Sequence, residues 1–198
     1  MCKLMIILIL ALLSAATAIA QDETPQQGAG GKGHFVAPVL KYTVINDQGV
    51  LMLGGRGGWN VNASLILGVG LYATVTEVDA PKGAVPSAPG PLDLKLESFG
   101  FELEYVPHPT AQTYITLYAF VGGAAGHYVR DKTREQHGET DFMLLLEPGV
   151  GVEHRIIDWL HLNLTGSYRL VNGVEQPLLK DADFSGPAAT LTVKFGQF

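Results

Sequence analysis

The chain has 198 residues, a net charge of −6 and 24 glycines, and only 16% of its residues are charged. Its 13 basic residues argue against nucleic-acid binding, because a phosphate backbone is recognised by clustered lysine and arginine. A single cysteine excludes a disulfide framework and a thiolate zinc cluster. The 47% hydrophobic content with so little charge is unusual for a soluble domain, in which about 25% of residues are charged.

The first twenty residues have the features of an export signal. Lys3 gives a short positive start, residues 4–13 are almost wholly apolar, and Ala18-Ile19-Ala20 fits a small-residue cleavage site. We therefore predict a signal peptide over residues 1–20. The polar, glycine-rich residues 21–33 are predicted to form a flexible lead-in, and residues 34–198 the folded domain.

From residue 34 onward, apolar and polar residues alternate with the period of two that is typical of β-strands. Leu162 and Leu164, for example, share one face, and His161 and Asn163 share the other. The pattern predicts eight strands, most of them longer than the roughly 5–6 residues of soluble sheets. They span approximately residues 34–45, 48–59, 63–77, 92–106, 112–128, 141–155, 159–171 and 184–196.

The predicted connections differ in length at the two ends of the strands. Short connections lie at residues 60–62, 107–110 and 156–158, and long ones at 78–91, 129–140 and 172–183. Long strands, an even strand count and loops that are short at one end only are typical of bacterial outer-membrane barrels. We predict an all-β fold, an eight-stranded antiparallel up-and-down transmembrane β-barrel.

Alternation alone does not decide which face points inward, since a soluble lipocalin-like barrel has the same period. Three features favour a barrel that spans the outer membrane and contacts its lipids. They are the export signal, apolar rows almost free of charge over about nine to eleven residues, and aromatic residues near strand ends. Trp59, Tyr105 and Trp159 lie at the short-turn side, where an interfacial girdle of aromatic residues is expected.

The export signal, the strand count and the terminal aromatic residue Phe198 together resemble the small outer-membrane barrels of the OmpX type and the OmpA transmembrane domain. The resemblance covers about residues 34–198. It implies that Phe198 is the signal read by the barrel-insertion machinery. Phe198 differs in parity from the outward row of Leu191, Val193 and Phe195, which departs from the usual register of these barrels.

The predicted inward positions carry charges of both signs. They are Lys41, Arg56, Glu102, Glu104, Glu147, Glu153, His161, Arg169 and Lys194. Isolated charges in a small lumen are costly, so these groups are expected to pair. Side chains just fill an eight-stranded barrel, which predicts a charge network that plugs the lumen. Inward glycines such as Gly68 and Gly70 are expected to leave room for the larger groups.

Centring the short turns gives expected strand registers. A hairpin centred on Ile157 places Glu153 opposite His161, and one centred near Pro109 places Glu104 opposite Tyr114. Tyr114, Thr116, Tyr118 and Phe120 are then expected to point inward, and Ile115, Leu117, Ala119 and Val121 to meet lipid. Pairing of Trp59 with Leu65 places Arg56 opposite Gly68.

We predict a non-catalytic envelope, adhesion or ligand-contact role, with an extracellular ligand contacting the loops at 78–91, 129–140 and 172–183. His161 with Glu153 supplies a base and its orienting partner, but no nucleophile is placed at the lipid face. The six histidines are dispersed, so neither a metal nor a cofactor is expected. Two alternatives are a lipid-modifying barrel enzyme and a soluble lipocalin-like periplasmic carrier.

Overall fold

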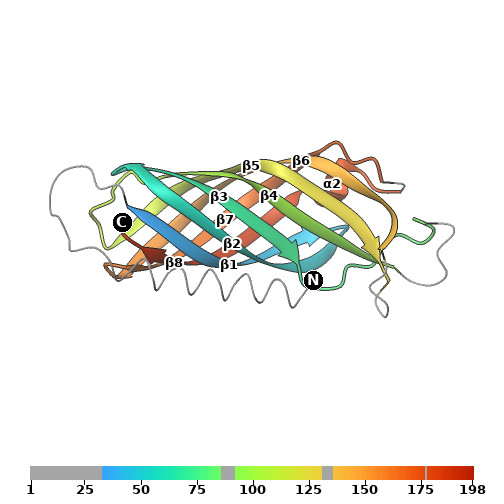
Figure 1. Cartoon of the computed structure of the whole chain (residues 1–198), viewed down its shortest axis with the longest axis horizontal. Coiled ribbons are helices and arrows are strands. Elements are labelled where there is room, and N and C mark those ends of the chain that lie inside the picture. Colours follow the sequence, from blue (N-terminus) through green and yellow to red (C-terminus); the bar gives the residue numbers. More distant parts are fainter. Residues whose placement is uncertain (1–32, 86–91, 131–135, 177) are drawn as a thin grey trace.

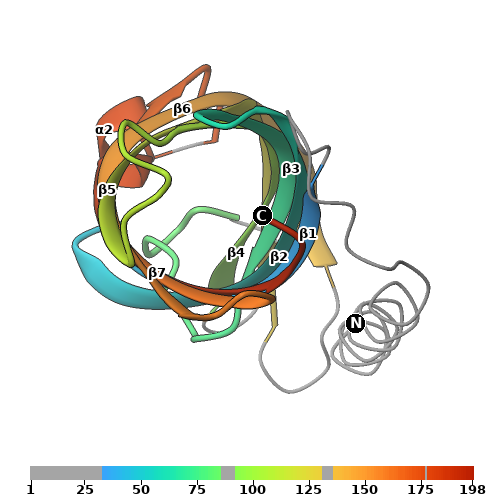
Figure 2. The ribbon, with the colours of Figure 1, turned by 90° about the vertical axis from the view of Figure 1, so that its left-hand side faces the viewer.

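The structure is a computed structural model that describes residues 33–85, 92–130, 136–176 and 178–198. The predicted signal peptide and nearly all of the predicted lead-in lie outside this range. The described residues form one closed antiparallel barrel in which β1 also pairs with β8 (Figures 1 and 2). Its elements are β1 (His34–Ile45), β2 (Gln48–Asn62), β3 (Leu65–Thr74), β4 (Asp93–Tyr105), β5 (Thr113–Val129), β6 (Gln136–Ile157), β7 (Leu160–Asn172), α2 (Asp181–Phe184) and β8 (Gly186–Gly196).

The predicted fold class is confirmed, and each predicted strand corresponds to an observed one. The largest difference is at β6, which begins at Gln136 instead of residue 141. Val129 pairs with Gln136 and Tyr128 with His137, so the β5–β6 hairpin continues into the predicted loop at 129–140. That loop prediction is therefore wrong for residues 136–140, because Gln-His-Gly-Glu-Thr contains no apolar residue that would show the strand alternation. Residues 131–135 lie outside the described range.

The expected registers are wrong, although the faces are correct. Arg56 lies opposite Gly70, Glu153 opposite Asn163, and Glu104 opposite Tyr118. Two of these hairpins are shifted by two residues, and each of them has an irregularity beside its turn, between Asn60 and Asn62 or between Arg155 and Ile157. The third hairpin is shifted by four residues because its last pair is Tyr105 with Leu117, so that the β4–β5 ladder is centred on residue 111 and not on Pro109. Even shifts leave every side chain on the same face of its strand.

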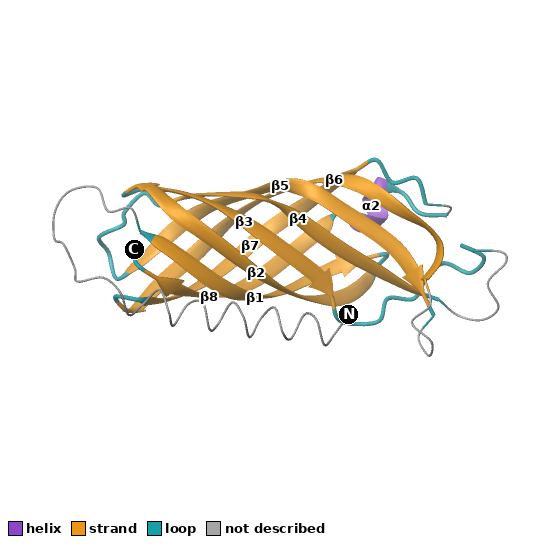
Figure 3. Cartoon of the chain, viewed as in Figure 1, coloured by secondary structure: helices purple, strands orange, loops and turns teal. Residues whose placement is uncertain are grey.

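The two ends of the barrel differ, as Figure 3 shows. One end carries the short turns and the end of β8, and the other carries α2 and the longer connections. At the latter end, β1 and β2 are joined by Asn46 and Asp47, whose φ angles are 50° and 59°. Positive φ at both central residues is the geometry of the tight hairpin turn that matches strand twist. In the described residues, no helix has the length and apolarity needed to cross a membrane.

The outer wall carries apolar side chains that stay largely exposed. Phe101, Phe142 and Leu144 expose 70%, 77% and 69% of their surface. Contiguous exposed apolar surface on this scale is absent from soluble monomers and is the form that a lipid-facing belt takes. We call this surface the apolar belt, and it includes Leu40, Phe99, Phe101, Leu117, Val121, Phe142, Leu144, Val150, Leu164 and Leu191.

The interior is layered along the barrel axis. Towards the loop end it is apolar, with a cluster that includes Met52, Leu94, Leu96, Leu145 and Phe184. Val78, Ala84 and Leu179 from the connections also belong to this loop-end cluster. The polar lumen expected from the sequence therefore occupies only part of the barrel, because apolar residues of the connections fold into the mouth.

Candidate functional site: the buried charge network

All nine predicted charged residues lie inside the barrel, and each exposes 6% or less of its surface. They project from β1, β2, β4, β6, β7 and β8, so they meet only because the sheet closes. We refer to these nine residues as the charge network.

Most of the charge network is one continuous chain of ion pairs. Lys194 Nζ lies 2.5 Å from Glu153 Oε2 and 2.6 Å from Glu104 Oε1. Arg56 Nη2 lies 2.9 Å from Glu104 Oε2, and Arg56 Nε lies 2.5 Å from Glu102 Oε2. These ion pairs connect β6, β8, β4 and β2 across the interior. Each charged group in them faces a group of opposite sign, which offsets the cost of its burial.

Tyrosine hydroxyls extend the chain of ion pairs at both of its ends. The Tyr114 hydroxyl donates to Glu153 Oε1 at 2.7 Å, and the Tyr118 hydroxyl donates to Glu102 Oε1 at 3.0 Å. Tyr72 also donates to Glu102. The alternation predicted that Tyr114 and Tyr118 face inward, but it did not indicate which carboxylate each one contacts.

A second ion pair lies beside this chain. Lys41 Nζ is 2.9 Å from Glu147 Oε1, and it also lies 4.2 Å from the centre of the Tyr72 ring. The Ser167 hydroxyl donates to Glu147 Oε1 at 2.7 Å. Lys41 thus has both an ionic and an aromatic partner in the interior.

Arg169 differs from the other buried cations. Its Nε donates to the Phe184 carbonyl oxygen at 2.7 Å, and its Nη2 donates to the Val44 carbonyl oxygen at 2.9 Å. In the described part of the chain, no carboxylate lies within salt-bridge distance of Arg169. The expectation that Arg169 pairs with a carboxylate is therefore wrong. Its guanidinium donates instead to backbone carbonyl oxygens of α2 and β1. Arg169 thereby ties the end of α2 to the loop end of β1.

Gly70 shows how an inward glycine makes room for a buried carboxylate. A Cβ atom at this position would collide with the Glu102 carboxylate and lie 2.9 Å from the Tyr72 hydroxyl. Only a residue without a side chain leaves Glu102 the space to reach Arg56 and both tyrosines.

The short-turn end of the lumen is covered by aromatic rings. The Phe198 ring stacks on His161 with centroids 3.7 Å apart, and Phe35 lies 6.0 Å further on. A cavity of about 190 Å³ remains beside them. Phe198 points inward here, as its parity indicated, and its role as an insertion signal stays a prediction.

The charge network contains few of the groups that catalysis or metal binding would require. His161 Nδ1 lies 2.8 Å from Glu153 Oε1, which orients the ring as a base would need. Ser167, which lies on the same strand as His161, is hydrogen-bonded to Glu147 and not to His161. Across the described residues, no three His, Cys, Asp or Glu side chains are grouped so as to hold a metal ion.

By sequence alone, no family model and no curated protein matches this chain. Solved structures do match it. The N-terminal β-barrel domain of Pseudomonas aeruginosa OprF is 14% identical, with a TM-score of 0.51 over 84% of this chain and 98% of that one. Neisserial surface protein A is 13% identical, with a TM-score of 0.56 over 86% and 99%. Ail of Yersinia pestis, solved with the heparin analogue sucrose octasulfate, is 10% identical, with a TM-score of 0.52 over 84% and 98%. At these identities the likeness shows the fold, which is that of the small outer-membrane β-barrels.

Proposed function

We propose that this protein is an integral barrel of a bacterial outer membrane, with a closed lumen and a non-catalytic envelope role. The observation that carries the proposal is the distribution of charge, which is inside, and of apolar surface, which is outside. A soluble carrier barrel has the opposite distribution, because its apolar face lines the ligand cavity. In this location the apolar belt contacts the hydrocarbon chains of the outer-membrane lipids.

The ends of the belt support this placement. Trp59, Tyr105 and Trp159 expose 51%, 45% and 53% of their surface at the short-turn end. Exposed amphipathic rings at one level are the form that an interfacial girdle takes. In this proposal the short turns face the periplasm, residues 1–20 are removed after export, residues 21–33 remain as a linker, and the insertion machinery recognises Phe198.

The cellular test is fractionation combined with heat-modifiable gel migration. The full-length protein expressed in bacteria is expected in the outer-membrane fraction, and its migration should change on boiling because the folded barrel resists detergent. A barrel-free lipoprotein in the same gel gives the control for migration that does not change. Recovery in the periplasm without detergent would contradict the proposal and support the carrier alternative.

A closed lumen predicts that ions do not pass. Ion pairs occupy the middle of the barrel, and Phe184 and its neighbours fill the loop end. Eight strands leave an interior that side chains just fill. We expect no conductance steps when the purified protein is added to planar lipid bilayers, whereas a sixteen-stranded porin in the same chamber gives them. Regular steps from this protein would show that the lumen is open.

We also propose that the loop end contacts an extracellular ligand through residues 78–91, 129–140 and 172–183. Within the described parts of these segments, Asp79, Lys82, Leu178 and Lys180 are exposed. Surface loops on a rigid barrel are free to vary and to bind. Incubation of the purified protein with labelled phospholipid or lipid A separates this role from the enzyme alternative, which requires the lipid to change.

A further inference from the structure

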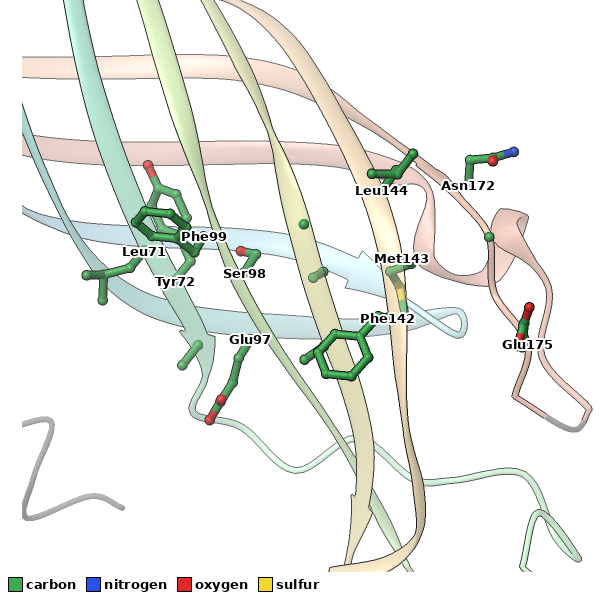
Figure 4. Close-up of a pocket in the computed structure, with 15 residues that line it drawn as sticks. Leu71, Tyr72, Glu97, Ser98, Phe99, Phe142, Met143, Leu144, Asn172 and Glu175 are labelled. Atoms are coloured by element: carbon green, nitrogen blue, oxygen red, sulfur yellow. The ribbon is translucent and has the colours of Figure 1, made fainter.

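The cavity of about 190 Å³ at the short-turn end lies beside the stacked rings of His161 and Phe198. It differs from a larger hollow on the outer wall, which is lined by Phe99, Phe142 and Leu144 of the apolar belt (Figure 4). The outer hollow is part of an exposed apolar surface, whereas the smaller cavity contains buried polar groups. We call the smaller one the short-turn cavity.

His161 brings a hydrogen-bond acceptor to this cavity. Its Nδ1 lies 2.8 Å from Glu153 Oε1, and Glu153 is a carboxylate paired with Lys194. A carboxylate only accepts hydrogen bonds, so Nδ1 carries the ring proton and Nε2 is the acceptor of the neutral ring. Lys194 and Arg155 lie opposite His161 on the two neighbouring strands, and their positive charges oppose a second proton on the ring.

This acceptor has no partner among the described residues. His161 exposes 3% of its surface, and its Nε2 makes no hydrogen bond. The two nitrogens of an imidazole point in nearly opposite directions, so Nε2 is directed away from Glu153 and towards the cavity that His161 lines. Asn60 Oδ1 is a second acceptor on the cavity wall that is buried without a described partner. Buried acceptors of this kind are stabilised by a donor.

The other polar residues of the cavity are already engaged or lie at its rim. The Tyr114 hydroxyl donates to Glu153, and Arg155 Nη2 lies 3.3 Å from the carbonyl oxygens of Thr110 and Ala111. Asp158 lines the cavity and is exposed, so the cavity is open to solvent between the short turns. The opposite charges of Arg155 and Asp158 leave no net charge that would select an ion.

Water fills such a cavity poorly. The rest of the lining is apolar and consists of Ala63, Ile66, Val106, Pro109 and Phe198. The 190 Å³ have room for about six water molecules at about 30 Å³ each, and every ordered water needs two to four polar partners. Two free acceptors cannot satisfy that number. One molecule with an apolar body gains dispersion contacts with these walls instead.

We propose that the short-turn cavity is a binding site for a small, neutral aromatic molecule that carries a hydroxyl or N–H donor. The donor is hydrogen-bonded to His161 Nε2 or Asn60 Oδ1, and the ring packs against Phe198, Ile66 and Val106. The inference goes beyond the proposed envelope role, because the cavity belongs to the barrel interior and does not depend on what surrounds the outer wall.

The resonance of the His161 ring tests the site directly. The full-length protein, labelled with ¹⁵N in histidine only, is placed in phosphatidylcholine nanodiscs, and the His161 signals are those missing from His161→Gln. We expect phenol to shift the Nε2 signal saturably. Toluene has the same ring without a donor, and benzoate is an anion, so both should leave the signal in place at the same concentrations.

A substitution at the rim fills the cavity, and a neighbouring one is its matched control. Ala63→Phe should abolish the phenol-dependent shift of His161. Val61→Phe adds the same ring in the same hairpin, at a residue that is 50% exposed and does not line the cavity, and should leave the shift unchanged. Heat-modifiable migration checks that each variant is folded, and the toluene comparison needs no variant.

The outcomes separate the parts of the proposal. No phenol-dependent shift, or a shift that persists in Ala63→Phe, would overturn the site. An equal shift with toluene would show that the free acceptors do not select the ligand, and a larger shift with benzoate would overturn its neutrality. None of these results bears on the membrane location, which fractionation tests separately.

Discussion

Replacing Arg56 with alanine is expected to destabilise the folded barrel by about 3–5 kcal/mol, the cost of leaving buried charges without their partner. Arg56 contacts both Glu102 and Glu104, so its loss leaves two carboxylates in the interior with fewer cations. Its guanidinium also lies 5.2 Å from the centre of the Tyr118 ring, a contact that alanine cannot make. The measurement is urea unfolding of the purified protein in lipid vesicles, with folded protein counted by its unboiled gel migration.

Two further variants separate the mechanism from a general effect of mutation. Lys82→Ala removes an exposed cation from the β3–β4 connection and should change stability by less than about 0.5 kcal/mol. Arg56→Lys retains the charge but cannot reach both carboxylates with a planar fork, so its stability should lie between those of the wild type and Arg56→Ala. If Arg56→Ala unfolds at the same urea concentration as Lys82→Ala, the buried ion pairs do not hold the barrel together.

Replacing Phe184 with alanine is the second change with a large expected effect, about 3–5 kcal/mol for a fully buried ring. Phe184 exposes 0% of its surface and packs in the loop-end cluster. Its carbonyl oxygen accepts the hydrogen bond from Arg169, so a cavity at this side chain also loosens the contact between α2 and the barrel wall. Urea unfolding gives the loss in stability, and limited trypsin digestion gives the local effect, because Lys180 in the same connection is exposed.

Leu178 offers a control in the same connection. It exposes 66% of its surface, and Leu178→Ala should leave both the urea midpoint and the rate of cleavage after Lys180 close to those of the wild type. Faster cleavage after Lys180 in Phe184→Ala but not in Leu178→Ala is the expected pattern. Equal cleavage rates in all three proteins would mean that Phe184 does not anchor the connection.

The faces of the strands were predictable because the period of two is a local property. Tyr114, Thr116 and Tyr118 were expected to point inward and are buried or half-buried, and Ile115 and Leu117 were expected to face outward and are exposed. The partners across each hairpin were not predictable. Arg56 lies opposite Gly70 instead of Gly68, and nothing in the alternation signals this shift or the irregularity near Asn60.

For the charge network, too, the inward face was predictable and the contact partners were not. Parity was enough to assign nine charged residues to the interior, but it could not indicate that Lys41 on β1 meets Glu147 on β6, or that Lys194 on β8 bridges Glu153 and Glu104. These strands are not neighbours in the sheet, and their side chains meet through the lumen. The hydrogen bond of Arg169 to the Phe184 carbonyl oxygen depends on α2. This four-residue helix lies within a connection that had no strand or helix pattern in the sequence.

The sequence by itself determined the number of strands, their approximate limits and which residues of each strand share a face, because the fold repeats one local rule along its length. Only the tertiary structure decided the ion-pair partners and the apolar filling of the loop end. Each of these depends on strand register and barrel closure, which bring together residues far apart in the chain. Registers are set by turns and bulges, whose effect on pairing appears only once the sheet is closed.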